Sequence, residues 1–110
     1  MRLAVLITYH NEGELLTECL RSLGAGSSPP AEIMVYDDAS VRGAAAYIPA
    51  GAGVQLLRGA DNVGPAIARN RLLAASRADW VHFHDADDLF LPGWAERVRA
   101  AAGEDVDCVF

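Results

Sequence analysis

The chain has 110 residues, the size of one domain, and its 52% hydrophobic and 22% charged residues are typical of a globular protein. A formal net charge of −6 argues against nucleic acid and anionic membranes as partners, because both are bound through clustered Lys and Arg. The two cysteines show no spacing typical of a zinc site or a disulfide framework, so we expect a reducing, cytoplasmic environment.

Four short apolar runs predict strands, and helical patterns separate them. The runs cover residues 3–8, 32–37, 54–58 and 80–85. This alternation predicts an α/β fold: one domain over residues 1–110, with an open, mostly parallel sheet and helices on both faces. Residues 106–110 look like the start of a fifth strand. The first run is too short for a membrane span or a signal peptide, so we expect no targeting segment here.

The helices differ in how clearly the sequence marks them. The first resembles a capping box, with Asn11 as N-cap and Glu14 three residues later, and it has one apolar stripe. That stripe consists of Leu15, Leu16, Cys19, Leu20 and Leu23. Residues 41–49 predict only a short or irregular helix. The third helix should begin at Pro65 and the fourth near Pro92. The fourth should present to the core Trp94, Ala95, Val98 and Ala102.

Each predicted strand is followed by polar residues. These are Thr8, Tyr9, His10, Asn11 and Glu12 after the first strand, Asp37, Asp38 and Ser40 after the second, Arg58, Asp61 and Asn62 after the third, and Asp85, Asp87 and Asp88 after the fourth. Ligands of open parallel sheets bind outside the carboxyl ends of the strands, so these side chains predict a binding edge. The competing interpretation is that such loops are polar anyway and that Asp, Asn and Ser are good caps.

The last group places three carboxylates within four positions, Asp85, Asp87 and Asp88. Their mutual repulsion favours either a bound cation or a well-solvated turn. A helix or turn cap needs only one carboxylate as acceptor, so capping alone does not account for three. Mg²⁺ and Mn²⁺ bind carboxylates together with phosphate oxygens and water. We therefore predict a metal site that bridges to a phosphorylated ligand.

Several other residues at this edge allow two interpretations each. Tyr9 is either a core aromatic or, as we favour, a stacking platform for a planar base. Arg69 and Arg71 are either ordinary helix-surface residues or, for at least one of them, a partner of a phosphate or an aspartate. His82 and His84 share one face of the fourth strand, and we expect partly buried, hydrogen-bonded rings instead of metal ligands.

Four segments carry a resemblance to a known family. They read VLITYHNEGELLTECLRSL, EIMVYDDAS, DNVGPAIARN and WVHFHDADDLFLPGW, and they occur in the order and roughly the spacing of the family 2 (GT-A fold) glycosyltransferases. The resemblance covers nearly the whole chain. It implies the nucleotide-binding half of an inverting enzyme that transfers a sugar to an acceptor hydroxyl. The expected partners are a nucleotide sugar, a UDP-sugar foremost, and a Mn²⁺ or Mg²⁺ cofactor.

The resemblance also implies roles for matching positions. Those assigned to nucleotide binding are Thr8, Tyr9, Glu12, Asp37, Asp38, Asn62, Gly64, Arg69 and Asp85. Among them, Asp38, or alternatively Asp37, resembles the carboxylate that reads a base N–H, and Asp85 is expected near the ribose or sugar. Asp87 resembles the ligand of the metal that bridges the diphosphate. Asp88 is similar to the residue that often follows, whereas His84 stands where the family usually has an apolar residue.

The general base of the family is usually an Asp or Glu in the second half of the fold, so we expect it beyond Phe110. The chain then resembles the nucleotide-binding half of a larger enzyme, or a naturally short protein. The alternative is a non-catalytic binding or assembly module that keeps the GT-A fold, in which a homodimer could cover the open sheet edge. A phosphatase or phosphotransferase ranks lower, because those enzymes commonly place their key aspartate after the first strand, where this chain has TYHNE.

Overall fold

The computed structural model describes all residues from 1 to 110, and its centre is a sheet of four parallel strands. The strands are β1 (Leu3–Tyr9), β2 (Glu32–Asp38), β3 (Val54–Gly59) and β4 (Trp80–Asp85). They lie in the order β3-β2-β1-β4, so β3 and β4 form the two edges. All four predicted strands are confirmed, and each of the first three is one residue longer than predicted.

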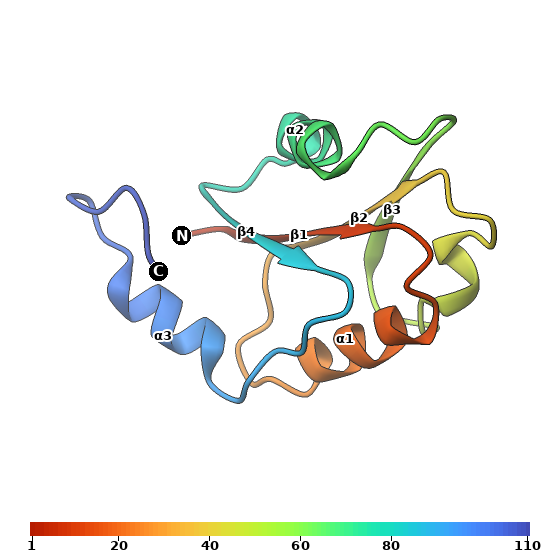
Figure 1. Ribbon diagram of the computed structural model, residues 1–110. Coiled ribbons are helices and arrows are strands. Elements are labelled where there is room, and N and C mark those ends of the chain that lie inside the picture. The colour runs from red at the N-terminus through yellow and green to blue at the C-terminus, as the bar shows by residue number, and fades with distance from the viewer.

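Three helices and one short 3-10 helix connect and cover the strands. They are α1 (Glu14–Gly24), η1 (Ala44–Tyr47), α2 (Pro65–Ala75) and α3 (Trp94–Ala101). In Figure 1, α2 lies over one face of the sheet, and α1 and α3 lie on the other side. The predicted fold class, an open parallel sheet with helices on both faces, is confirmed. None of the helices combines the length and hydrophobicity that crossing a membrane requires.

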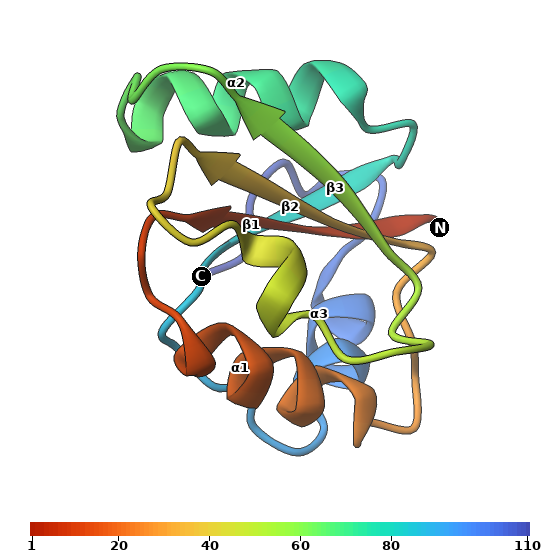
Figure 2. The ribbon, with the colours of Figure 1, turned by 90° about the vertical axis from the view of Figure 1, so that its right-hand side faces the viewer.

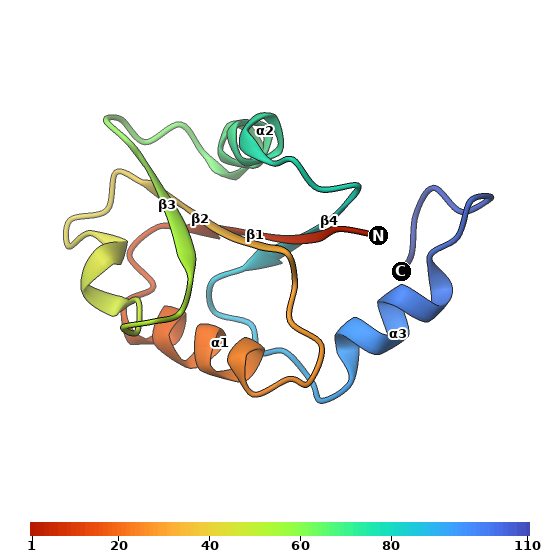
Figure 3. The same ribbon diagram turned by 180° about the vertical axis from the view of Figure 1, so that it is seen from behind.

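The two faces of the sheet bury two separate cores. Alternate residues of a strand point to opposite faces, so Val5 and Ile7 of β1 pack towards α1, and Ala4 and Leu6 pack towards α2. β1 is buried on both sides, which explains its uninterrupted apolar sequence. The core on the α1 side is the larger and includes η1, which lies on that side of the sheet in Figure 3.

The sheet has a switch point between β1 and β4. The chain runs from β1 to β2 and β3 on one side of β1, and β4 pairs on the other side. At the carboxyl ends of the strands, the chain leaves β1 for α1 on one face and leaves β3 for α2 on the other face, so a crevice remains between these two connections. Figure 2 shows the arrowheads of β1, β2 and β3 at one edge, beside the beginnings of α1 and α2.

The predicted capping box of the first helix is wrong. α1 begins at Glu14, the N-cap position is held by Gly13, and no side chain caps the helix. Asn11 has a left-handed backbone with φ of 63°, and its side-chain oxygen accepts a hydrogen bond from the Val41 backbone N–H, 2.9 Å away. The side chain therefore joins two loops instead of capping the helix.

The predicted fifth strand is also wrong. Residues 106–110 pair with no strand, and the Val106 N–H donates to the carbonyl of Gly103 in a turn. The edge of β4 is accordingly left unpaired by this chain. The prediction for residues 41–49 is confirmed by the short η1, and α2 begins at Pro65 as expected.

The two cysteines should differ strongly in reactivity. Burial raises the pKa of Cys19 to about 12, and the negative charges of Asp88 and Asp87 add to this, whereas Cys108 is exposed. At pH 8 only about one Cys19 side chain in ten thousand is then a thiolate, the reactive form. We predict that a thiol reagent labels one cysteine per folded chain and two per unfolded chain. Rapid labelling of Cys19 in a folded Cys108→Ser variant would contradict this burial.

Candidate functional site

A cleft of about 440 Å³ lies at the carboxyl ends of the strands, at the switch point. It is lined by Thr8, Tyr9, His10, Glu12, Asp38, Pro65, Ala68, Arg69, Asp85 and Asp87. All of these except His10, Pro65 and Ala68 are site residues predicted from the sequence. The structure therefore brings together residues that are up to 79 positions apart, from Thr8 to Asp87.

The strand register aligns the floor of the cleft. Thr8 of β1 lies directly opposite Asp85 of β4, and on the other side of β1 Tyr9 lies opposite Asp37 of β2. These pairs are the last of their ladders, so the residues beyond them leave the sheet together at one edge. Strand pairing alone therefore places Thr8 and Asp85 next to each other, and the loops are not needed for it.

Asp38 fixes the wall of the cleft on the α2 side. Its two carboxylate oxygens accept hydrogen bonds from the backbone N–H groups of Val63 at 2.8 Å and Gly64 at 2.9 Å. Gly64 has φ of 87°, a conformation that favours glycine, and α2 begins at the next residue, Pro65. Gly64 and Asn62 lie outside the lining of the cleft, and Gly64 serves to place the start of α2 beside it.

Asp37 is closed to any ligand, which excludes it as the reader of a nucleobase. Its side chain is fully buried and accepts hydrogen bonds from the backbone N–H groups of Ser40 and Ala44 and from the Arg58 guanidinium, at 2.8–3.0 Å. Burial alone would raise the pKa of Asp37, but these hydrogen bonds and the charge of Arg58 outweigh it and lower the pKa. For Asp37 the competing interpretation from the sequence is therefore the right one: its side chain caps backbone N–H groups of the following loop.

Tyr9 offers no open ring face, so the predicted stacking platform is wrong. Only 1% of Tyr9 is exposed, and its ring lies in the core on the α1 side, 6.4 Å from the ring of Tyr47. Its hydroxyl accepts a hydrogen bond from the Gly13 backbone N–H at 3.1 Å. Burial raises the pKa of the Tyr9 phenol, which keeps it neutral. Tyr9 thus supports the turn before α1 from beneath the cleft.

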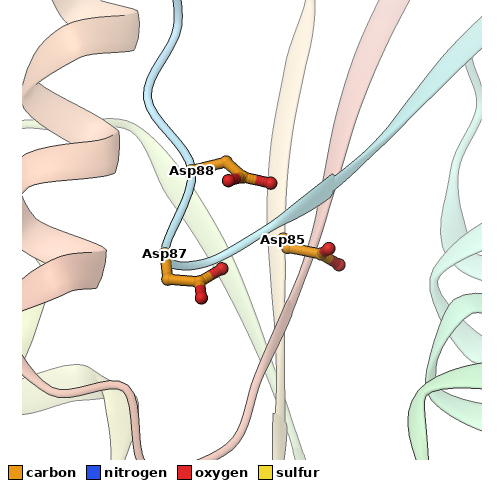
Figure 4. Close-up of side chains that lie close together, drawn as sticks. All are labelled: Asp85, Asp87 and Asp88. Atoms are coloured by element: carbon orange, nitrogen blue, oxygen red, sulfur yellow. The ribbon is translucent and has the colours of Figure 1, made fainter.

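The three aspartates after β4 form an exposed cluster. Asp85, Asp87 and Asp88 can each place a carboxylate oxygen within 4.8 Å of the others, and Figure 4 shows all three extending to the same side of the loop. Mg²⁺ binds oxygens at about 2.0–2.1 Å, so two oxygens that share one ion lie at most about 4.2 Å apart, and these exposed side chains need to approach one another by only about half an ångström. Hard carboxylate oxygens are also the ligands these ions prefer. The cluster therefore fits the predicted cofactor in spacing and in chemistry.

Arg69 is the arginine that lines the cleft. Its Nη2 atom lies 3.4 Å from the Oδ1 atom of Asp85, which confirms the expected pairing of an arginine with an aspartate. Arg71, two residues further along α2, instead lies over the ring of Tyr36 with its guanidinium carbon 5.7 Å from the ring centre. Both partners of the Arg69–Asp85 pair are substantially exposed, so the pair holds Arg69 weakly and leaves it free to meet an anion.

The two histidines of β4 have the packing role that was expected. The His84 ring is stacked on Phe90, with centroids 3.9 Å apart, and its Nε2 atom lies 3.0 Å from the carbonyl oxygen of Asp88. The His82 ring packs against Trp94. Burial, and then the neighbouring His84, lower the pKa of His82, so its ring is neutral at pH 7. The rings support the loop that carries the aspartates.

The sequence analysis did not predict Pro65 and Ala68 at the cleft, and it placed His10 at the binding edge without giving it a role. Pro65, Ala68 and Arg69 occupy positions i, i+3 and i+4 of α2, which share one helix face. That spacing could have identified Pro65 and Ala68 once Arg69 was placed. The sequence shows that His10 is polar and follows a strand, but it does not show which residues contact the two ring nitrogens.

Fold and cleft together define an α/β domain with a cleft at the carboxyl ends of its parallel strands, next to an aspartate cluster. Residues 4–110 match the family model described as glycosyl transferase family 2. This match covers nearly all of the chain, and the chain belongs to this family.

Curated relatives are longer proteins. The chain is 33% identical over 108 residues to the uncharacterized glycosyltransferase YibD of Escherichia coli strain K12, covering 94% of this chain and 31% of that protein. It is 31% identical over 105 residues to the succinoglycan biosynthesis protein ExoU of Rhizobium meliloti strain 1021, covering 92% of this chain and 30% of that protein. The chain therefore spans about a third of the length of the relatives it matches.

Solved structures share the GT-A fold of this chain. TarS 1-349 of S. aureus in complex with UDP-GlcNAc superposes with a TM-score of 0.77 at 23% identity, covering 91% of this chain and 30% of that one. The mannosyltransferase PcManGT of Pyrobaculum calidifontis in complex with GDP-Man and Mn²⁺ has a TM-score of 0.74 at 26% identity, covering 81% and 28%.

The buried Asp37 network should be measurable in the stability of the protein. Because the pKa of Asp37 is lowered by folding, its contribution is complete above its ordinary pKa of 3.8 and is lost as the pH falls through the folded value. We predict that Asp37→Ala lowers the free energy of unfolding at pH 7 by about 2–4 kcal/mol in urea denaturation. The difference from wild type should shrink as the pH falls below 3.8.

Asp107→Ala is the matched control, because Asp107 is an exposed aspartate that should change the stability little. An Asp37→Ala variant as stable as this control at pH 7 would show that the network contributes nothing.

Proposed function

We propose that this chain is the nucleotide-diphospho-sugar-binding part of an inverting, metal-dependent glycosyltransferase that transfers a sugar to an acceptor hydroxyl. The observation that carries the proposal is the convergence of Thr8, Glu12, Asp38, Arg69 and the Asp85–Asp88 loop on one cleft at the switch point of the sheet. Membership of glycosyl transferase family 2 gives this convergence its chemical interpretation.

The end of the cleft near β1 and β2 suits a nucleoside. Glu12 and Asp38 are carboxylates, which only accept hydrogen bonds when ionised, and the hydroxyl of Thr8 can donate or accept. A base N–H group and ribose hydroxyls are the matching donors of a ligand. Asp38 already accepts two backbone N–H groups, one at each carboxylate oxygen, and keeps lone pairs for a further donor such as the N–H of uracil.

The other end of the cleft suits a diphosphate. Asp87, with Asp85 beside it, would hold a Mn²⁺ or Mg²⁺ ion, and Arg69 lies where its guanidinium could bind a phosphate oxygen. When bound, such an ion stabilises the negative charge that grows on a departing nucleoside diphosphate. TarS in complex with UDP-GlcNAc and UDP, and PcManGT with GDP-Man and Mn²⁺, support this kind of ligand; we propose a UDP-sugar first.

We propose that residues outside these 110 supply the remaining parts of the reaction. In an inverting transfer the acceptor oxygen forms a bond to the anomeric carbon while the bond from that carbon to the diphosphate breaks, and a general base takes the acceptor proton. We place that base and the acceptor site beyond Phe110. The relatives YibD and ExoU, about three times as long as the match, support this placement.

Calorimetric titration of UDP, GDP and the other nucleoside diphosphates, with and without Mn²⁺, tests the proposal. We predict that one nucleotide binds in the presence of Mn²⁺ and that Asp87→Ala weakens this binding at least about tenfold, because it removes the proposed metal ligand. Asp107→Ala provides the control, since it removes an exposed carboxylate far along the chain from the cleft residues. Folded wild-type protein that binds no nucleotide under any condition would mean either that the site needs residues beyond Phe110 or that the fold serves as a non-catalytic assembly module.

Arg69 and Arg71 provide a second, matched comparison on α2. If Arg69 binds a phosphate, Arg69→Ala should weaken UDP binding about five- to tenfold and leave uridine binding nearly unchanged. Arg71→Ala should alter neither affinity, because Arg71 contacts Tyr36 outside the cleft lining. Equal weakening by the two variants would remove the phosphate role of Arg69.

A further inference from the structure

His10 follows directly on β1 and lines the cleft, and both of its ring nitrogens have partners. Nδ1 lies 2.7 Å from the backbone carbonyl oxygen of Asp38. Nε2 lies 3.2 Å from the side-chain nitrogen of Asn62 and 3.2 Å from that of Asn11. The ring therefore contacts the last residue of β2 and the loops that follow β1 and β3.

These contacts select one tautomer of the ring. A carbonyl oxygen can only accept a hydrogen bond, so the proton must be on Nδ1 and point to Asp38. The amide of Asn11 gives an independent constraint. Its oxygen accepts the Val41 backbone N–H at 2.9 Å, so its NH₂ group is the end that faces His10. Nε2 is then an acceptor, and it has no proton. Free neutral histidine favours the opposite tautomer, so the protein imposes this one.

The same residues close a ring of interactions around the wall of the cleft. The Asp38 carbonyl binds His10, while the Asp38 carboxylate binds the N–H groups of Val63 and Gly64. Asn62, the residue before Val63, returns to His10. The loop that leads into α2 is thus held at two points, by Asp38 directly and by His10 through Asn62. Since α2 carries Arg69, the position of His10 is coupled to the position of the cleft's arginine.

A mere packing role does not explain this arrangement. His10 is exposed and belongs to neither hydrophobic core, so the ring gains little from burial. Directed hydrogen bonds hold it instead: Nδ1–H donates to the Asp38 carbonyl, and the amide nitrogens of Asn11 and Asn62 share the one lone pair of Nε2, an arrangement that only the Nδ1–H tautomer allows.

We propose that His10 is a positioning residue of the nucleotide cleft: a neutral imidazole in the Nδ1–H form that ties the end of β2 and the loops after β1 and β3 into one wall. Its effect on ligand affinity rests on the proposed function, but its tautomer and its hold on the loop are properties of the free protein. The tests are therefore chosen to separate the two.

The first test uses the free protein. Long-range ¹H–¹⁵N spectra at pH 8 distinguish the two neutral tautomers by the nitrogen shifts of the ring. We expect the Nδ1–H form for His10 in the wild-type protein. In His10→Ala, the amide protons of Val63 and Gly64 should exchange with solvent about five- to tenfold faster, because the loop loses one of its two anchors. An Nε2–H ring, or unchanged exchange at both amides, would overturn the proposal.

The second test separates the two ring nitrogens. Asparagine places an NH₂ group near the position of Nδ1, so His10→Asn should keep the bond to Asp38 and lose the acceptor for Asn62. We expect UDP affinity with Mn²⁺ to fall at least about tenfold in His10→Ala and by a smaller factor in His10→Asn. If His10→Asn lost as much UDP affinity as His10→Ala, the Nδ1 hydrogen bond would have no role in binding.

A double-mutant cycle then asks whether His10 acts through Asn62. If it does, the fold-losses in affinity of His10→Ala and Asn62→Ala should be far from multiplicative when combined. Asn70→Ala, an exposed asparagine on α2, should combine multiplicatively with His10→Ala and serves as control. A multiplicative result for Asn62 would refute the coupling. If the wild-type protein binds no nucleotide, this chain alone does not form the proposed site, and the spectra and exchange rates still decide the tautomer and the anchoring.

Discussion

Two successive carboxylates at the end of β2 hold the loops on both faces of the sheet, and the shape of the cleft depends on them. Strand alternation points Asp37 towards the α1 side, where it binds the N–H groups of Ser40 and Ala44, and Asp38 towards the α2 side, where it binds the loop before α2. One residue thus anchors η1 and the other anchors the start of α2. The identical side chains have different fates because one faces the core and the other borders the cleft.

The charge of the cleft supports the proposed role of a cation. The lining contains four carboxylates, those of Glu12, Asp38, Asp85 and Asp87, and one arginine, Arg69. A diphosphate brought into such a site meets repulsion that a single guanidinium does not offset. A divalent ion among the aspartates reverses the local sign, so the metal and the nucleotide would bind as one ligand set. The wall near β2, anchored by Asp38, then fixes the position of α2. The loop after β4 supplies the negative carboxylates that would hold the cation.

Sequence patterns were sufficient for the sheet and for the location of the cleft. Short apolar runs defined the strands, and the carboxyl-end rule gathered residues as distant as Thr8 and Asp87. Tertiary contacts decided the rest. Tyr9 stands at a strand end, but helices cover both faces of the sheet, so position alone did not reveal that its ring enters the core. Asparagine is a common helix cap, yet the side chain of Asn11 accepts a hydrogen bond from the Val41 backbone N–H in another loop.

The Asp38 carboxylate holds the loop before α2 through backbone groups of that loop and not through its side chains. Asp38 binds the N–H groups of Val63 and Gly64, and every residue except proline supplies such a group; only Gly64 is demanded by its own backbone angle. Substitution of Val63 can therefore leave this anchor intact, whereas Asn62 contacts His10 through its side chain. The start of α2 thus depends on the backbone of this loop, on one glycine and on one asparagine.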